Sequence, residues 1–255
     1  MKITRAVVPS LFTVLNMFCG FLSIVQSSEG KFTNACWFIV LAGVFDSLDG
    51  FMARLTKSSS QFGVEIDSLS DVVSFGTAPA FLVYKLSLFQ LEGFGLIISS
   101  LLALLGGIRL ARFNIQLVGF DKNYFVGLPI PASAITIISF VLFFYDEKSG
   151  AFLYSFAPTI LPFLTVIVSL LMVSKVKYDT LPKFSKKEFQ QHPIRTISAL
   201  FAALLIIFTK GNAIFFVCLA FILFGLIKYV YEFFQNHFHH NSKTEDTEEV
   251  ANYDV

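Results

Sequence analysis

Four aspartates in the first third of the chain have the residue type and the spacing of a metal site. Asp46 and Asp49 are three residues apart, and Asp67 and Asp71 are four residues apart. Positions three or four apart lie on one face of a helix, so each pair would present two carboxylates to the same side. Long apolar runs flank both pairs, and an ionisable group at membrane depth is costly and marks a functional site by default.

Four carboxylates in one confined space need cations to offset their charge. Carboxylate oxygens are hard ligands that suit Mg²⁺ or Mn²⁺. Two such ions stabilise both the entering and the leaving oxygen of a displacement at phosphorus. We therefore predict a site for two divalent ions on Asp46, Asp49, Asp67 and Asp71. A single one of these aspartates would fit a helix cap equally well, but four at two helical spacings favour the metal site.

Small residues accompany the aspartates. Gly50 and Ala53 follow Asp49 and precede Arg54, and Gly63 precedes Asp67 by four residues. Small side chains allow a second backbone or a ligand to approach closely. Residues 55–62 are mostly polar and long enough to reverse the chain. Two helices would then lie side by side with the carboxylates between them.

The composition indicates the class of protein that surrounds this site. The chain has 255 residues, of which 55% are hydrophobic and 15% charged, with a mean hydropathy of +0.70. Soluble domains are roughly 45–50% apolar and about 25% charged. We therefore predict an all-α polytopic membrane helix bundle. No basic tract is broad enough for a nucleic-acid partner, and the three cysteines, all in apolar runs, read as small buried residues.

About eight apolar segments approach the length of roughly 20 residues that a membrane helix needs. They cover residues 8–27, 34–54, 63–88, 93–112, 130–146, 154–174, 194–209 and 212–235. We expect one membrane domain over residues 1–236 and a polar, acidic tail without ordered structure over residues 237–255.

The positions of lysine and arginine predict the orientation in the membrane. Cytoplasmic loops carry an excess of these residues. With a cytoplasmic N-terminus, 15 of the 19 would lie on the cytoplasmic side, and only Lys31, Lys85, Lys148 and Lys210 on the other. We therefore expect both termini and the aspartates on the cytoplasmic side of the cell membrane.

The aspartate stretch also resembles a known family. It reads D-x-x-D-G-x-x-A-R, then eight residues, then G-x-x-x-D-x-x-x-D, which is the signature of the CDP-alcohol phosphatidyltransferases. These enzymes move a phosphatidyl group from a CDP-lipid to an alcohol and release CMP. The resemblance implies that Asp46, Asp49 and Asp67 hold the metals and that Asp71 completes the site and accepts the proton of the attacking hydroxyl. It also implies that Gly50, Ala53, Arg54 and Gly63 form the nucleotide and diphosphate pocket.

Further stretches over residues 5–145 resemble the membrane-integral phosphatidylserine synthases of bacteria and archaea. Thr13 and Asn16 lie in the first apolar segment, R-L-A-R-F-N spans residues 109–114, and F-V-G-L-P-I-P-A spans residues 125–132. Serine carries a carboxylate, which arginine binds in two bonds. Arg109 and Arg112 are therefore candidates for serine binding, with Asn114 as a polar neighbour, although arginines at a helix end also serve as lipid anchors. Asn16 either bonds to a neighbouring helix or contacts the nucleotide.

The resemblance implies CDP-diacylglycerol and L-serine as substrates and membrane lipid as the surroundings. Glycerol 3-phosphate or inositol phosphate as acceptor, and a cation transporter, are the alternatives. A transporter would spread its acids through the membrane depth, whereas these cluster near one face. Gly106 and Gly107 would allow two copies to pair, so a homodimer is a further expectation.

Overall fold

The computed structural model describes residues 7–56, 61–116, 124–179, 193–209 and 211–251. The chain is mostly helical. The helices are α1 (Val7–Ser28), α2 (Phe32–Thr56), α3 (Gln61–Asp71), η1 (Val72–Thr77), α4 (Ala78–Leu86), η2 (Leu88–Leu91), α5 (Glu92–Gln116), α6 (Ile130–Phe144), α7 (Ala157–Val173), α9 (Pro193–Phe208) and α10 (Ile214–Ala251).

The apolar segments that the sequence predicts all correspond to helices. Within the described residues, five spans are long and apolar enough to cross a membrane: 11–28, 32–53, 62–86, 88–115 and 214–232. The helices over residues 130–144 and 157–173 are apolar but shorter, and α9 has 16 residues. Large apolar side chains such as Phe94, Ile115 and Phe208 are exposed. A membrane protein presents such side chains to lipid, and these features agree with a helical membrane protein.

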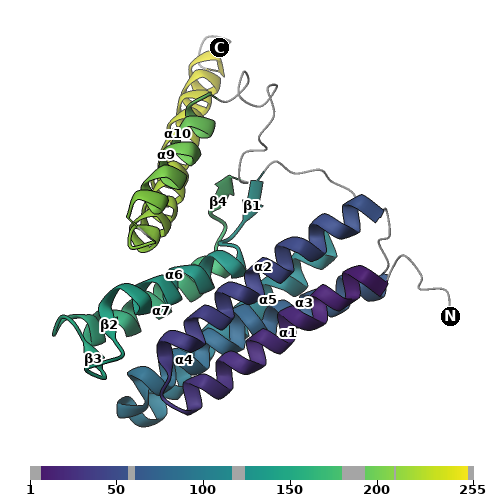
Figure 1. Cartoon of the computed structure of the whole chain (residues 1–255). Coiled ribbons are helices and arrows are strands. Elements are labelled where there is room, and N and C mark those ends of the chain that lie inside the picture. The colour runs from purple at the N-terminus through teal and green to yellow at the C-terminus, as the bar shows by residue number, and fades with distance from the viewer. Residues whose placement is uncertain (1–6, 57–60, 117–123, 180–192, 210, 252–255) are drawn as a thin grey trace.

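Figure 1 shows α1 to α7 packed side by side, with α9 and α10 as a hairpin set at an angle to them. Within the bundle, α1 packs along α2 and also contacts α3, η1 and α4. Among the described residues, α10 reaches the bundle through α6 and β4. α1 is therefore the helix against which both aspartate-bearing helices can be fixed.

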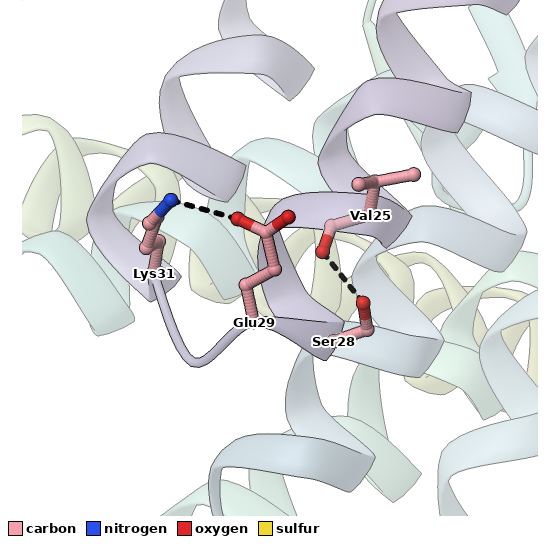
Figure 2. Close-up of polar contacts among 4 residues, drawn as sticks. All are labelled: Val25, Ser28, Glu29 and Lys31. Carbon is pink, nitrogen blue, oxygen red and sulfur yellow. Dashed lines mark hydrogen bonds and ion pairs between the residues drawn. The ribbon is translucent and has the colours of Figure 1, made fainter.

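The turn between α1 and α2 shows why the chain reverses at this position. Gly30 has a φ of +77°, and the amides of Gly30 and Lys31 donate to the carbonyls of Ser27 and Gln26 at 3.2 and 3.0 Å. These bonds form the motif that commonly ends a helix at glycine. Figure 2 shows Lys31 paired with Glu29 at 2.7 Å, and Ser28 Oγ donating to the Val25 carbonyl at 2.7 Å.

The third predicted segment contains a break in regular α-helix. The π-helical η1 begins directly after Asp71, and the Ala78 amide donates to the Val73 carbonyl, five residues back. Pro79 follows and has no amide to continue an α-helical ladder. Single π-turns are frequent at functional sites. The continuous helix that the sequence predicts over 63–88 is therefore interrupted at the site itself.

The described part of the chain also contains two short antiparallel ribbons. β2 (Tyr145–Asp146) pairs with β3 (Ala151–Phe152) in the turn between α6 and α7. β1 (Tyr124–Val126) pairs with β4 (Lys177–Asp179) and lies between the bundle and the α9–α10 hairpin (Figure 1). The second ribbon joins the segment after α5 to the segment after α7.

Three expectations change or gain detail in the structure. All three cysteines are free; Cys19 and Cys36 are buried, as expected, whereas Cys218 is only partly buried. The predicted tail from residue 237 continues α10 as helix to Ala251, because extending an existing helix needs no new nucleation.

A Cβ at Gly106 would meet Ile130, and one at Gly107 would touch Val72. Both glycines pack within the chain, which removes the argument for dimerisation through them.

Candidate active site

Three of the four aspartates meet in one cluster. Ligand oxygens of Asp46 on α2 and of Asp67 and Asp71 on α3 all lie within 4.8 Å of one another. Asp71 is 9% exposed, and the other two are partly buried. Asp67 and Asp71 share one face because they are four residues apart on a helix. The structure therefore brings the two predicted helices together with their carboxylates between them.

Asp49 lies beside this cluster and has a different partner. It is buried, and its Oδ2 accepts a hydrogen bond from the hydroxyl of Thr13 on α1. The charges of Asp46 and Asp49 act on each other. Asp49 is thus oriented by α1 at the edge of the three-carboxylate group.

α1 donates to the second aspartate-bearing helix as well. Asn16 Nδ2 donates to Asp71 Oδ1 at 3.4 Å. In the reverse direction, Ser70 Oγ donates to the Thr13 carbonyl at 3.0 Å and Ser74 Oγ donates to the Asn16 carbonyl at 2.9 Å. Buried polar groups need such partners. These bonds fix α1, α3 and η1 in one register.

Sequence reasoning missed Ser70 and Ser74 as part of this framework. A signal was available, because the two serines are four residues apart and follow the aspartates at helical spacing. Gly20 shows how close the helices approach, since a Cβ there would lie 2.7 Å from the Ser74 Cα. Hydroxyls next to a small residue at this spacing are typical of helix packing in membranes.

The two arginines of α5 have different surroundings. Arg109 is 7% exposed, and Asp71 is the charge that acts on it. Its Cζ lies 6.0 Å from the centroid of the Phe113 ring, and its Nε has no hydrogen-bond partner among the described residues. Arg112 is exposed and donates to the Val173 carbonyl at 3.1 Å. Arg109 is therefore buried within electrostatic range of Asp71, whereas Arg112 joins α5 to the end of α7.

Asn114 of α5 contacts the aspartate-bearing helix α3 through a serine. Its Nδ2 donates to Ser68 Oγ at 2.9 Å, and Ser68 follows Asp67 directly in α3. α5 is thereby joined to the aspartate-bearing helix through a polar contact.

The small residues predicted to line the nucleotide pocket lie near the end of α2 and near the beginning of α3. Gly50, Ala53 and Gly63 are partly buried on α2 and α3. Arg54 belongs to the last turns of α2, but its side chain lies outside the described part, as do residues 57–60 of the predicted connecting turn. The pocket formed by these residues therefore stays a prediction.

The donor set fits a divalent cation. The cluster offers three carboxylates with converging oxygens, and no lysine or arginine in the described part of the chain forms an ion pair with them. Hard oxygen donors are the ligands that Mg²⁺ and Mn²⁺ prefer, and Arg109, although within electrostatic range of Asp71, forms no ion pair with the cluster. The residues present are thus suited to the metal chemistry that the sequence pattern predicts.

A cavity of about 350 Å³ lies elsewhere, at the opposite end of the bundle. It is lined by Phe32, Leu86, Tyr145 and Phe152, among others, which belong to the α1–α2 turn, the end of α4 and the β2–β3 ribbon. This end holds Lys31 and Lys148 and none of the clustered aspartates. The cavity is therefore separate from the carboxylate site.

Comparison with known proteins identifies the family. The sequence pattern of the family described as CDP-alcohol phosphatidyltransferase matches residues 6–172. A CDP-diacylglycerol–serine O-phosphatidyltransferase of Helicobacter pylori is 40% identical over 178 residues, which cover 70% of this chain and 73% of that protein.

Two archaeal proteins are similar as well. An archaetidylserine synthase of Methanothermobacter thermautotrophicus is 43% identical over 181 residues, or 69% of this chain and 72% of that protein. A CDP-diacylglycerol–serine O-phosphatidyltransferase of Methanocaldococcus jannaschii is 37% identical over 218 residues, or 86% of this chain and 92% of that protein. With its carboxylate cluster on α2 and α3 and this match over most of its length, the chain belongs to the CDP-alcohol phosphatidyltransferase family.

Proposed function

We propose that the protein is a CDP-diacylglycerol–serine O-phosphatidyltransferase. It transfers a phosphatidyl group from CDP-diacylglycerol to the hydroxyl of L-serine and releases CMP. The observation that carries this proposal is the convergence of Asp46, Asp67 and Asp71 in a chain whose relatives at 37–43% identity are serine phosphatidyltransferases by name or closely related synthases.

The reaction is a direct displacement at phosphorus. The serine hydroxyl oxygen forms a bond to the phosphorus that bears diacylglycerol, and the bond from that phosphorus to the bridging oxygen of CMP breaks. Asp71 accepts the hydroxyl proton, a role that requires hydrogen-bond reach to the bound serine. No covalent intermediate is part of this proposal: the hydroxyl of Thr13, which donates to Asp49, is assigned to orienting that carboxylate and not to attack on phosphorus.

Asp46, Asp49, Asp67 and Asp71 would hold two divalent ions, Mg²⁺ or Mn²⁺. Bound there, the ions would offset the diphosphate charge and that of the departing CMP. Thr13 donates to one oxygen of Asp49 and so fixes the orientation of that carboxylate. Asn16 orients Asp71 by its amide. The two α1 side chains thus hold carboxylates from different helices in place before substrate binds.

Gly50, Ala53 and Gly63 leave space beside the carboxylates for the diphosphate and the cytidine, and Arg54 supplies a positive charge at that end of α2. Asn16 and Asp49 border the same space from α1 and α2. Arg109 is the residue we assign to the serine carboxylate, because it is a buried cation beside Asp71 with an unpaired Nε among the described residues. Asn114 remains a neighbour of the site, and Arg112 serves to anchor α5 to α7.

We further propose eight membrane segments with both termini and the active site on the cytoplasmic side of the cell membrane. The support is that Lys31, in the α1–α2 turn, and Lys148, in the β2–β3 ribbon, lie at the same end of the bundle. The contact between Phe32 and Tyr145, whose ring centroids are 5.5 Å apart, brings this turn and this ribbon together. The arginines of α5 lie toward the other end. CDP-diacylglycerol would enter from the cytoplasmic leaflet with its acyl chains between helices.

The test is CMP release by the purified protein in detergent, with CDP-diacylglycerol, Mg²⁺ or Mn²⁺, and L-serine, glycerol 3-phosphate or inositol phosphate in turn. Release that depends on the metal and on serine is expected. Metal-dependent release with another acceptor would keep the carboxylate site and overturn the role of Arg109 toward serine. Absence of release with every acceptor, from folded protein, would overturn the enzyme assignment and favour cation transport.

A further inference from the structure

Arg109 depends on an aromatic side chain for its position. Phe113 lies four residues further along α5, and the guanidinium carbon is 6.0 Å from its ring centroid. A cation over an aromatic face is attracted by the ring, most strongly where water is excluded. Arg109 is 7% exposed and Phe113 is 36% exposed, so the guanidinium is buried and the ring lies at the boundary between it and the surroundings of the helix. The Nε of Arg109 is buried without a hydrogen-bond partner among the described residues, so this donor remains to be satisfied by a bound group.

Phe113 is in turn supported from outside α5. Its ring centroid lies 6.3 Å from that of Phe125, with an angle of 48° between the planes. Tilted aromatic pairs at this distance stabilise each other. Phe125 is the central residue of β1, so the position of the pair depends on how β1 is fixed.

The β1–β4 ribbon is fixed on both sides. Phe125 pairs with Tyr178 of β4. After β1, the amides of Gly127 and Leu128 donate to the carbonyls of Val176 and Leu171 at 2.8 and 3.0 Å. Gly127 has a φ of +79° and lies so close to the Met172 carbonyl that no side chain would fit. The ribbon is thus held against the end of α7.

The other side of the ribbon contacts the C-terminal hairpin. Tyr178 is buried and packs on Phe221 of α10 with ring centroids 5.4 Å apart. A Cβ at Gly225 would meet the Tyr178 ring. Strand β4 and the whole of α10 lie beyond residue 172, where the match to the family pattern ends. A chain of contacts therefore runs from α10 through the ribbon and the aromatic pair to Arg109.

From this chain of contacts we propose that Phe113 and Phe125 are positioning residues for substrate binding. They hold the Arg109 guanidinium in the orientation that receives the carboxylate of the acceptor amino acid. The proposal rests on the proposed function, since that function supplies the carboxylate. Neither phenylalanine touches the reacting atoms, so both act through the arginine.

The test compares steady-state CMP release by full-length variants at saturating CDP-diacylglycerol and varied L-serine. Phe113→Leu keeps an apolar side chain and removes the ring, and Phe113→Tyr keeps the ring. We expect Phe113→Leu to raise the KM for serine about three- to thirtyfold, the range that loss of a cation–π contact allows, with kcat changed by less than about twofold. Phe113→Tyr should restore the KM, and Phe125→Leu should produce a smaller rise of the same kind.

Phe94→Leu is the matched control, because Phe94 lies on the same helix and is 78% exposed. It should leave both constants unchanged. In an Arg109→Gln background, Phe113→Leu should have no further effect on the KM for serine, because the two residues act as one unit. Equal effects of Phe113→Leu and Phe113→Tyr, or effects that add to that of Arg109→Gln, would overturn the positioning role.

The design separates this proposal from the proposed function. If Arg109→Gln changes the KM for CDP-diacylglycerol and not that for serine, the assignment to the serine carboxylate fails. In that case, a change in the KM for CDP-diacylglycerol caused by Phe113→Leu would still support the positioning role of Phe113. An unchanged KM for CDP-diacylglycerol in Phe113→Leu would overturn that role. If another acceptor replaces serine, the same variants are measured against that acceptor. No CMP release with any acceptor would overturn both proposals.

Discussion

The side-chain amide of Asn16 donates to the carboxylate of Asp71 at 3.4 Å, across 55 residues of sequence. Thr13, one turn earlier on α1, donates to Asp49. One helix without an aspartate of its own thereby holds one carboxylate from each of the two aspartate-bearing helices. Thr13 and Asn16 share a face of α1 because they are three residues apart. α1 therefore fixes the orientation of two of the four aspartates.

Removing the hydroxyl of Thr13 should weaken metal binding. Side chains that orient metal ligands typically contribute about 10- to 100-fold to metal affinity or activity. We expect Thr13→Val to raise the Mg²⁺ or Mn²⁺ concentration needed for half-maximal CMP release by about this factor, and Thr13→Ser to restore it. Thr165→Val is the control, because Thr165 is also buried but bonds to the Leu161 carbonyl of its own helix. An unchanged metal requirement in Thr13→Val would contradict the role.

Neutralising a clustered carboxylate should abolish turnover without unfolding the protein. We expect Asp67→Asn and Asp71→Asn each to reduce CMP release to background, because the cluster loses ligand charge and, at Asp71, the proton acceptor. The thermal stabilisation of the protein by divalent ions should disappear in the same variants. Glu65→Gln is the control, since Glu65 lies on α3 and is exposed. Near-normal activity in a folded Asp67→Asn variant would refute the metal site.

The close approach of α1 and η1 should tolerate no side chain at Gly20. A Cβ there would lie 2.7 Å from the backbone of Ser74, so Gly20→Ala has to displace one helix. We expect a loss of about 1–3 kcal/mol, as for other overpacked sites, seen as a lower melting temperature in detergent. Gly93→Ala is the matched control, with nothing within 4 Å of its Cβ. It should be neutral or stabilise α5 by up to about 1 kcal/mol.

Tyr178 offers a test of the ribbon. Its hydroxyl is buried with no hydrogen-bond partner among the described residues, and burial raises the pKa of Tyr178 to about 12. A buried unpaired polar group costs about 1–3 kcal/mol. Tyr178→Phe should therefore leave stability unchanged or raise it by about 1 kcal/mol, measured as the melting temperature in detergent. A clear loss would mean that the hydroxyl has a partner outside the described residues.

The orientation can be measured with single cysteines in a background where Cys19, Cys36 and Cys218 are replaced by alanine. Lys31→Cys and Lys148→Cys lie at the same end of the bundle and should react with a membrane-impermeant maleimide on intact cells. Lys175→Cys, beyond the other end of α7, should react only after the membrane is opened. α7 has 17 residues and is roughly 25 Å long, which separates the two sides. The reverse labelling pattern would place the active site outside the cell.

Much of this site could be predicted from the sequence because its features are local. Asp46 and Asp49, and Asp67 and Asp71, share helix faces by their spacing alone, whatever surrounds them. The length of each apolar segment is likewise a local property, and it predicts a helix. The predicted segments correspond to α1 to α7, α9 and α10. The sequence likewise predicted that Asn16 would bond either to another helix or to the nucleotide, and the structure shows the first.

The relations between helices were decided only by the tertiary structure. Arg109 and Arg112 are three residues apart, yet one is buried beside Asp71 and the other bonds to the end of α7. The serine bonds from Ser70 and Ser74, the π-helical turn after Asp71 and the packing of Phe125 on Phe113 have no local signature that specifies their partners. Helical spacing is a property of one backbone, whereas a contact between helices depends on how side chains from distant segments pack. The residue types and spacings thus predicted the chemistry, and the packing of α1, α5 and the β1–β4 ribbon decided which side chains orient it.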